Sequence, residues 1–228
     1  MKKILITGGA GFLGSHLVRS LKRDYLITVV DILKPVGGIP FIDPAVTFIN
    51  SDIRDLKTYK ELSKYKFDAI FHLAAQSAGE PSYDDPHFDI NTNIYGTYMV
   101  CKYAVETNVK HFLYTSSVAV YGTADGKILT EKNIIKPDSI YGISKYSGEM
   151  YIKLLTKNSN TNYTIFRVFN TYGPGENLNY NKKGMVSIYA SYLWKNKPIK
   201  VKGSIERYRD FTFIDDSVSG MTLALFNT

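Results

Sequence analysis

The chain has 228 residues, of which 44% are hydrophobic and 21% are charged, and its net charge is +7. This composition excludes a disordered or fibrous protein, and the single cysteine, Cys101, excludes an internal disulfide and fits a reducing compartment. The basic residues are scattered rather than gathered into runs, so the charge does not predict nucleic-acid binding. Glycines interrupt the N-terminal run MKKILITGGAGF before a signal peptide or a membrane span could form, so we expect a cytoplasmic protein without a membrane segment.

Short apolar runs of β type recur along the chain, and stretches with helical potential separate them. We expect strands at residues 3–7, 26–31, 46–50, 69–74, 111–117 and 164–169. We expect helices at residues 12–23, 54–65, 86–108 and 139–158. Strands that alternate with helices form right-handed crossovers and a parallel sheet covered on both faces. The expected fold class is therefore α/β, a doubly wound, Rossmann-like parallel sheet.

The character of the sequence changes after residue 170. The stretch NTYGPGENLNYNKKG is rich in Gly, Asn and Pro and predicts turns and loops. A helix at 185–196, a short strand at 199–203, the stretch RDFTFI at 209–214 and the start of a last helix follow. We therefore divide the chain into a sheet domain at 1–170 and a small C-terminal lobe at 171–228, interleaved with the end of the sheet and covering part of its carboxyl edge.

A glycine-rich turn follows the first strand in TGGAGFLGSHLVRSL, with glycines at 8, 9, 11 and 14. The first glycine of such a turn reverses the chain, the middle one lets backbone approach a pyrophosphate, and the last lets helix and strand pack closely. The second strand ends at Asp31, where a carboxylate accepts hydrogen bonds from ribose hydroxyls and repels a 2′-phosphate. The motif predicts dinucleotide binding, with NAD favoured over NADP.

A tyrosine and a lysine, Tyr141 and Lys145, lie one helical turn apart in PDSIYGISKYSGE. A free phenol is a poor base at neutral pH, but a neighbouring cation together with an oxidised nicotinamide would bring it into a useful range. A tyrosine and a lysine with this spacing, without other signals, are usually solvated surface residues. Here the fifth strand ends in Ser116 and Ser117, whose hydroxyls could hold a substrate oxygen against the phenol or, for Ser116, merely cap the strand.

Taken in order, these motifs resemble the extended short-chain dehydrogenase/reductase family, in its branch of NAD-dependent epimerases and dehydratases of nucleotide sugars. The matching stretches are TGGAGFLG at 7–14, Asp31, SDIRD at 51–55, HLAAQ at 72–76, NTNIYGT at 91–97, TSSVAVYG at 115–122, Tyr141 to Lys145, RVFNTYGPG at 167–175 and RDFTFIDD at 209–216. They span nearly the whole chain.

The resemblance implies roles for individual residues. The implied cofactor-binding residues are Gly8, Gly11, Phe12, Leu13, Gly14, Asp31, Asp52, Ile53, Leu73, Ala74, Ala75, Asn93, Ser116, Tyr141 and Lys145. The implied catalytic residues are Ser117, Tyr141 and Lys145. Ser117, Asn170 and Arg209 are the implied substrate-binding residues, and a guanidinium such as that of Arg209 suits a diphosphate, with Arg207 a weaker candidate.

The resemblance also implies a first step, oxidation of the sugar at C4 with Tyr141 as the base. Dehydratases of this branch carry an acid just after the hydroxyl of the fifth strand, whereas this chain has Val118 and Ala119 there. We therefore expect NAD-dependent C4 epimerisation of a nucleotide-diphosphate sugar through a 4-keto intermediate. The alternatives are a 4-keto reductase, a dehydratase, a decarboxylase, a 2-epimerase or a noncatalytic NAD-binding protein.

The histidines have no metal-ligand spacing, so we expect no metal. In the resembling family the helices that correspond to 86–108 and 139–158 pair between subunits, which implies a homodimer. Family members continue beyond the RDFTFIDD segment, so the C-terminal lobe is expected to be incomplete. We expect the residues that set sugar size to lie partly in the loop 176–184.

Overall fold

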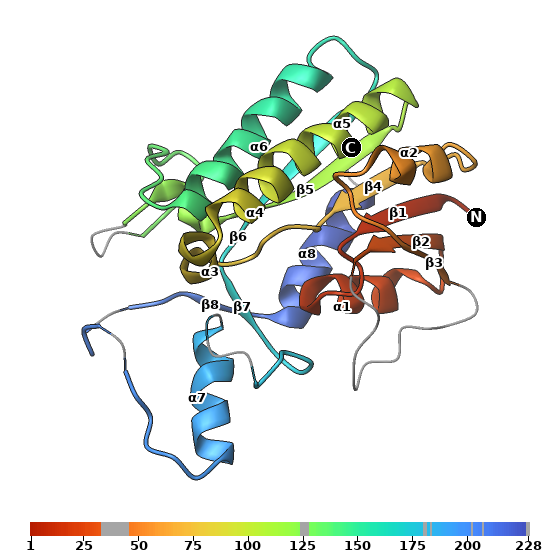
Figure 1. Cartoon of the computed structure of the whole chain (residues 1–228). Helices are drawn as coiled ribbons and strands as arrows, with labels where there is room; N and C mark the ends of the chain where they lie inside the picture. The colour runs from red at the N-terminus through yellow and green to blue at the C-terminus, as the bar shows by residue number, and fades with distance from the viewer. Residues whose placement is uncertain are drawn as a thin grey trace.

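The computed structural model describes residues 1–32, 46–123, 128–179, 182, 184–201, 203–206 and 208–226. Six parallel strands form one sheet in the order β3-β2-β1-β4-β5-β6 (Figure 1). They are β1 (Lys3–Thr7), β2 (Leu26–Asp31), β3 (Val46–Asn50), β4 (Ala69–His72), β5 (His111–Ser117) and β6 (Asn162–Val168). The predicted α/β fold with a doubly wound parallel sheet is confirmed. Among the described residues β3 and β6 are the two edges of this sheet.

Helices cover both faces of the sheet. On one face lie α1 (Phe12–Leu21) and α8 (Ile214–Phe226), and on the other lie α5 (Thr97–Glu106) and α6 (Ile140–Thr156), with α2 (Leu56–Leu62) nearer the β3 side (Figure 1). Because side chains alternate along a strand, Ile4 and Ile6 of β1 pack in the core beneath α1 and α8, whereas Leu5 packs in the core beneath α5 and α6. This explains why the strand reads as a continuous apolar run.

The predicted helix 86–108 is three consecutive segments. They are α4 (Pro86–Ile90), a π-helical turn (Asn91–Gly96) and α5, and the short helix α3 (Gly79–Asp84), which the sequence did not predict, precedes them. Asp85 caps α4 by accepting a hydrogen bond of 2.9 Å from the backbone N–H of Phe88. A 3₁₀ turn, Val118–Tyr121, follows β5. The short helices α3 and α4 and the π-helical turn lie in the connection that follows β4, and the 3₁₀ turn follows β5. The predicted site lies at the carboxyl ends of these two strands.

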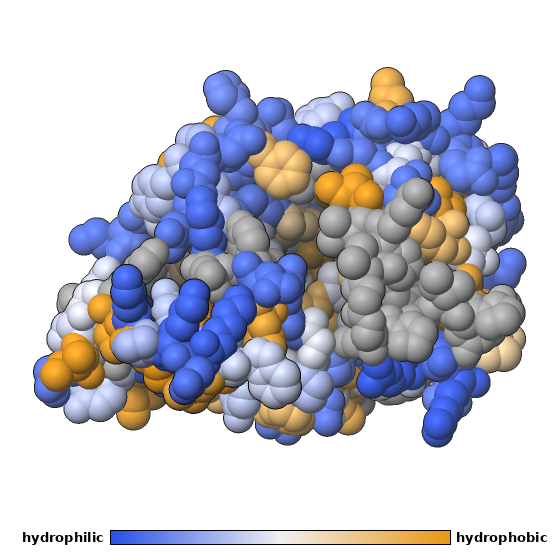
Figure 2. Space-filling model, turned by 60° about the horizontal axis from the view of Figure 1, so that its bottom comes forward, coloured by the Kyte–Doolittle hydropathy of each residue, from blue (hydrophilic) through white to orange (hydrophobic). Residues whose placement is uncertain are grey.

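The C-terminal lobe consists of α7 (Met185–Trp194) and a two-stranded parallel sheet formed by β7 (Asn170–Tyr172) and β8 (Phe211–Phe213). Figure 1 shows α7 well apart from the main sheet. Figure 2 shows hydrophobic residues exposed together at the lower left of its view. The predicted strand at 199–203 is wrong at 199–201 and 203, where the chain is irregular. Ile199 and Val201 are exposed and have no strand beside them, and a strand needs a partner to be stable.

The chain returns from this lobe to the main sheet through α8, which packs against α1. Ile214, Val218 and Met221 of α8 belong to the same core as β1. The division of the chain at residue 170 stays a prediction. Part of the loop 176–184, and Arg207, lie outside the described residues. Within the part of the chain that the structure describes, no helix is both long and apolar enough to span a membrane.

Candidate active site

The glycine-rich turn lies against the loop that follows β4. Gly8 has φ +75°, and a Cβ atom there would lie 2.5 Å from the backbone nitrogen of Ala74. A Cβ atom on Gly14 would lie 2.1 Å from the carbonyl oxygen of Gly8. Side chains at these two positions are therefore excluded by backbone atoms, which cannot move aside. The turn brings the expected cofactor residues Gly8, Gly14, Leu73 and Ala74 together.

Helix α1 starts directly after this turn, with Gly11 as its N-cap residue. No side chain caps it, and its first turn carries no acidic residue. The first amides of a helix have no partner within the helix, and the helix dipole makes this end favourable for an anion. The backbone amides of Phe12, Leu13 and Gly14 therefore suit a pyrophosphate, and the glycine cradle beside them fits the dinucleotide that the sequence predicts.

Asp31 ends β2 beside the glycine-rich turn. The residue is buried, and its Oδ2 accepts a hydrogen bond of 2.9 Å from the backbone N–H of Ala10. This contact fixes the carboxylate next to the turn, at the place where the sequence predicts the ribose acid. The geometry therefore suits a ribose diol, while the contact itself stays a prediction.

Asp52 and Ile53 follow β3, the strand that pairs with β2. A salt bridge of 2.6 Å joins Asp52 Oδ2 to Arg54 Nη2, and the hydrogen bonds from Arg54 lower the pKa of the Asp52 carboxyl. Ile53 is buried, and its side chain occupies the space that a Cβ atom on Gly96 would need. The predicted contact of both residues with adenine is not tested by these interactions and stays a prediction.

Tyr141 lies in the first turn of α6, directly beside the end of β5. Ser139 caps the helix by accepting a hydrogen bond from the backbone N–H of Gly142. A Cβ atom on Gly142 would lie 2.5 Å from the carbonyl oxygen of Ala119, so glycine allows α6 to approach the turn after β5. As a result the hydroxyl of Ser117 lies close enough to the phenol of Tyr141 to lower its pKa. The structure thus joins two of the three residues predicted to be catalytic.

Burial dominates the acidities of the third residue, Lys145, and of Tyr141. It raises the pKa of Tyr141 to about 12, against a smaller lowering by the hydrogen bond with Ser117. It lowers the pKa of Lys145 to about 7, although the charges of Asp89 and Glu149 act in the opposite direction. The sequence argument expected the lysine to make the phenol more acidic. In the chain alone desolvation dominates the pKa values of both groups, because Lys145 is buried and Tyr141 is partly buried.

The ammonium of Lys145 lies over an aromatic ring that sequence reasoning missed. Its Nζ is 4.7 Å from the ring centroid of Tyr114, a residue of β5 that is fully buried. The Tyr114 ring in turn stacks on His72, 5.6 Å between centroids. His72 Nδ1 is 2.6 Å from Thr7 Oγ1 and its Nε2 is 2.9 Å from Thr97 Oγ1. The cation–π contact holds the lysine in place. The Tyr114 ring that makes this contact is itself held by its stacking on His72 and by the hydrogen bonds of His72.

Asn93 connects the loop after β4 to α6. Its Oδ1 accepts a hydrogen bond of 2.8 Å from the backbone N–H of Gln76, and its Nδ2 lies 3.0 Å from the Gln76 carbonyl oxygen. The same Nδ2 is 3.1 Å from Ser144 Oγ and 3.0 Å from Asp89 Oδ2. Asn93 lies in the π-helical turn, a distortion that is frequent at functional sites. The residue supports the loop and the helix on which the site is built; a cofactor contact stays a prediction.

The hydroxyl of Ser116 is bound within the protein. Its Oγ donates a hydrogen bond of 2.6 Å to Glu149 Oε1, and Arg167 donates to both oxygens of the same carboxylate. Arg167 also donates from Nη1 to the Tyr121 hydroxyl, at 2.8 Å. Sequence reasoning missed Glu149 and Arg167, which lie on α6 and β6. The predicted cofactor contact of Ser116 stays a prediction.

The two remaining substrate residues lie in the C-terminal lobe. Asn170 is in β7, where its Nδ2 donates a hydrogen bond of 2.9 Å to the carbonyl oxygen of Asp210. Arg209 is the residue before Asp210, and its Nη1 donates to the Tyr208 carbonyl oxygen. Both side chains are exposed. The structure therefore brings Asn170 and Arg209 near each other through β7 and β8, whereas their contact with a substrate stays a prediction.

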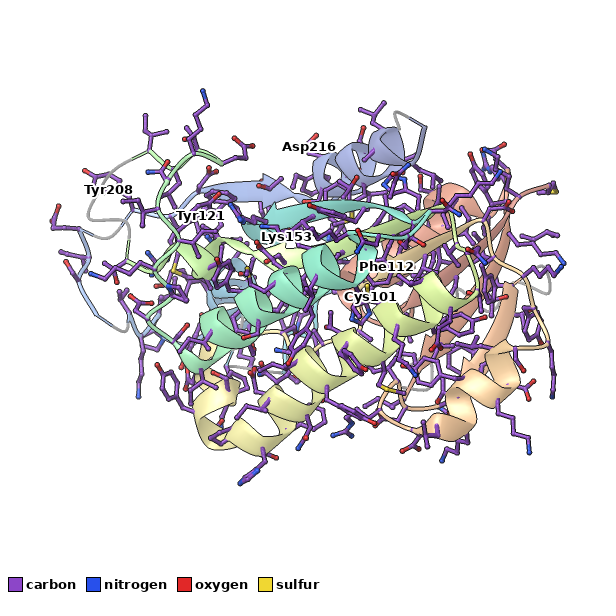
Figure 3. All side chains as sticks on the ribbon, turned by 90° about the horizontal axis from the view of Figure 1, so that it is seen from above. Cys101, Phe112, Tyr121, Lys153, Tyr208 and Asp216 are labelled. Atoms are coloured by element: carbon purple, nitrogen blue, oxygen red, sulfur yellow. The ribbon has the colours of Figure 1, made fainter. Side chains whose placement is uncertain are left out.

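A cavity of about 620 Å³ runs along the edge strand β6, and neither Tyr141 nor Lys145 lines it. Tyr121, Lys153 of α6 and Asp216 of α8 border it from three elements (Figure 3). In the same view Phe112 and Cys101 lie in the core between the sheet and the helices α5 and α6. Within the described ranges no group of three or more His, Cys, Asp or Glu side chains is placed to hold a metal ion.

Comparison with known proteins agrees with this geometry. Residues 4–228 match the model of the NAD dependent epimerase/dehydratase family. The chain is 31% identical over 229 residues to the UDP-glucose 4-epimerase of Mycolicibacterium smegmatis, covering 97% of this chain and 72% of that protein. It is 30% identical over 233 residues to the dTDP-D-glucose 4,6-dehydratase of Mus musculus, covering 98% of this chain and 64% of that protein.

A solved structure extends the likeness to three dimensions. The UDP-glucose 4-epimerase of Thermotoga maritima, determined with UDP-glucose, has a TM-score of 0.90 and 32% sequence identity over 98% of this chain and 73% of its own. The Rossmann-like sheet with its glycine cradle and its Ser, Tyr and Lys cluster defines a short-chain dehydrogenase/reductase of the extended type. The chain belongs to the NAD dependent epimerase/dehydratase family, as its motifs predicted. The description of this family names NAD, the cofactor that the sequence predicts.

Proposed function

We propose that the protein epimerises a nucleotide-diphosphate sugar at C4 through a transient 4-keto intermediate. The observation that carries this proposal is that Ser117 ends β5 while Tyr141 and Lys145 lie one turn apart near the start of α6, which packs against β5. Ser117 orients the sugar hydroxyl, and Tyr141 removes its proton while C4 is oxidised. When bound, NAD supplies a hydride acceptor and a positive charge near the phenol. The reverse transfer to the other face of the keto sugar completes epimerisation.

The pKa values indicate that the phenolate form of Tyr141 is hardly populated until a positive charge is added. Tyr141 has a pKa raised to about 12 by burial, so the phenol of the chain alone is protonated at neutral pH. A cation beside a phenol lowers its pKa, and Lys145, whose own pKa is about 7, is protonated for only part of the time at neutral pH. Proton removal by Tyr141 therefore requires a charged Lys145 and a charged nicotinamide together.

The acids near this cluster favour epimerisation over elimination. A 4,6-dehydratase must move protons at C5 and C6, which needs a carboxyl group facing the sugar. The positions after Ser117 are Val118 and Ala119. Asp89 and Glu149 are the acids whose charges act on Lys145, and both have 0% exposure and hydrogen bonds inside the protein. A 4-keto reductase remains the second candidate, because it uses the same Ser, Tyr and Lys, and NADH suits Asp31.

Proton NMR with a panel of UDP-, dTDP-, GDP- and CDP-sugars and a catalytic amount of NAD tests the proposal. The C4 epimer should accumulate to a stable ratio without net NADH. Tyr141→Phe should remove this turnover and leave NAD binding intact, because it deletes only the phenol oxygen. If the Phe variant turns over normally, the mechanism is wrong. Stoichiometric consumption of NADH on a 4-keto sugar would instead assign a reductase.

We also propose that the protein is a homodimer whose subunits meet through α5 and α6. The outer side of α6 and the π-helical turn that precedes α5 carry exposed apolar and aromatic residues, which are Tyr95 on the turn and Ile143, Met150, Tyr151 and Leu154 on α6. Exposed apolar side chains that share one surface mark contact sites. Leu154→Glu should convert a dimer to a monomer in sedimentation velocity, with Leu223→Glu on α8 as the matched control. A wild-type monomer would contradict the proposal.

A further inference from the structure

His16 is a histidine of α1 to which the reaction above gives no role. It is only 9% exposed, and its Nε2 lies 2.9 Å from the backbone carbonyl oxygen of Pro174. A carbonyl oxygen only accepts hydrogen bonds, so Nε2 of His16 carries a proton and donates it. The bond joins the helix that begins at the glycine-rich turn to the segment that leads from β7 into the C-terminal lobe.

The turn that accepts this bond consists of Gly173, Pro174 and Gly175. Gly175 has φ +95°, a conformation that favours glycine. A Cβ atom on Gly173 would lie 2.5 Å from Cγ2 of Ile214, which is fully buried at the start of α8. Glycine therefore lets the turn lie against the core. Proline fixes its own φ at about −65°, which restricts the backbone at the residue whose carbonyl oxygen accepts the bond.

The imidazole of His16 is also held from the side of the predicted cofactor. The ring of Phe12, in the first turn of α1, packs edge-on against it, with 5.7 Å between the ring centroids. The backbone amide of Phe12 is one of those that suit the pyrophosphate. An anion bound there orders the first turn of the helix, because it satisfies amides that have no partner within the helix. Phe12, His16 and Pro174 thus form a continuous line of contacts from the predicted pyrophosphate position to the C-terminal lobe.

Other contacts of the lobe with the rest of the chain begin at other elements. Thr171 Oγ1 of β7 is 3.1 Å from Ser217 Oγ of α8. Lys182 forms a salt bridge of 2.5 Å with Asp84 at the end of α3, and both side chains are exposed, so water screens this pair. Neither contact involves α1, whereas the bond of His16 starts on the helix that the cofactor is expected to contact.

We propose that His16 is a positioning residue that couples cofactor binding to the C-terminal lobe. NAD bound at the start of α1 orders Phe12 and with it His16, and the bond to Pro174 passes this order to β7 and β8. Asn170, a predicted substrate residue, lies in β7. NAD should therefore strengthen nucleotide-sugar binding, and the sugar should strengthen NAD binding by the same factor. The coupling to the lobe is a property of the folded chain, and only its effect on sugar binding rests on the proposed function.

Amide hydrogen exchange measured by mass spectrometry tests the coupling without any sugar. Peptides that cover 170–172 and 211–213 report on the two strands of the lobe. NAD should slow their exchange by about fivefold or more, the lower end of a typical coupling. ADP, which carries a pyrophosphate but no nicotinamide, should slow it as well. Protection by NAD but not by ADP would assign the effect to the nicotinamide end of the cofactor and would overturn the proposal.

Two substitutions separate the hydrogen bond from the bulk of the ring. His16→Leu fills the space without a donor, whereas His16→Gln places an amide nitrogen at a similar reach and still donates. With NAD saturating each variant, the protection of β7 and β8 should be lost in the first and kept in the second. Arg19→Gln, at an exposed position of α1, is the matched control and should behave as the wild type.

Protection of β7 and β8 in His16→Leu equal to that in the wild type overturns the proposal. Equal loss in His16→Leu and His16→Gln assigns the effect to ring packing and also overturns the role of the hydrogen bond. If His16→Leu does not fold, His16→Asn takes its place, because its shorter amide keeps a polar group but does not reach the carbonyl oxygen of Pro174.

The consequence for the substrate is measured by titration with UDP. In the wild type NAD should lower the Kd of UDP by about fivefold or more, and this gain should disappear in His16→Leu and return in His16→Gln. In the epimerase assay His16→Leu should raise KM for the sugar and change kcat little, since Ser117, Tyr141 and Lys145 are unaltered. A gain from NAD that is the same in His16→Leu and the wild type overturns the coupling to substrate. Exchange and UDP results as expected, without turnover on the sugar panel, would refute the proposed function and leave the coupling intact.

Discussion

Removing Arg167 should destabilise the fold strongly, because it leaves Glu149 as an uncompensated buried charge. The Glu149 carboxylate has 0% exposure and accepts hydrogen bonds from Arg167 Nε at 3.0 Å, Arg167 Nη2 at 2.8 Å and Ser116 Oγ at 2.6 Å. Arg167→Met removes the first two and the cation. Breaking a buried ion pair from one side costs about 3 to 5 kcal/mol. The carboxylate would keep one short hydrogen bond, so we expect the lower end, about 3 kcal/mol.

Urea unfolding with linear extrapolation measures this loss. Lys102→Met is the matched control, because Lys102 and Glu106 form a salt bridge of 3.1 Å on the surface, where a pair contributes below about 1 kcal/mol. The double variant Glu149→Leu/Arg167→Met should recover most of the stability, since no buried charge is then left alone. If Arg167→Met costs no more than Lys102→Met, the reasoning is refuted.

Three further perturbations test the cradle, the core and the ribose acid. Gly8→Ala should lower the melting temperature and weaken NAD binding, because its Cβ would lie 2.5 Å from the Ala74 nitrogen at a φ of +75°; a variant as stable as the wild type would contradict this. Burial lowers the pKa of His72 to about 3, so the unfolded chain binds the extra proton, and stability should fall by about 1.4 kcal/mol per pH unit below about pH 6.5. His72→Gln should remove that part of the acid slope in urea unfolding; an unchanged slope would refute it. Asp31→Asn keeps an acceptor for Ala10 but removes the charge, and Asp31→Ala removes both, so both should weaken the preference for NAD over NADP in binding titrations; an unchanged preference would show that the ribose acid lies elsewhere.

The sheet and the cofactor turn could be predicted because their signals are local. Each strand of the main sheet is a short apolar run, and the glycines mark positions where the backbone itself comes close to Ala74 or Gly8. The strand at 199–203 was mispredicted for a related reason. An apolar run shows the tendency to form a strand, but pairing requires a neighbour, and Ile199 and Val201 have none.

The residues predicted to be catalytic were identified from their spacing, but their environment could not be predicted in the same way. The spacing of Tyr141 and Lys145 shows that they share a helical face; it does not show that Lys145 is buried and Tyr141 partly buried, and this desolvation dominates their pKa values. Glu149, Asp89 and Tyr114 come from α6, α4 and β5 and meet only in the folded chain. In the sequence alone these residues cannot be told apart from ordinary surface or core residues of the same types. Such long-range electrostatics require the structure.

The edge strand β6 also affects how this chain behaves at high concentration. Among the described strands it pairs with β5 on one side only, and its outer backbone N–H and C=O groups are available to another extended chain. Proline and lysine are the usual protections of an edge strand against edge-to-edge association. The seven residues of β6 include Tyr163 and Ile165 but neither a proline nor a lysine. The isolated chain should therefore associate through this strand at high concentration. Tyr163→Lys is the substitution that should reduce this association most directly.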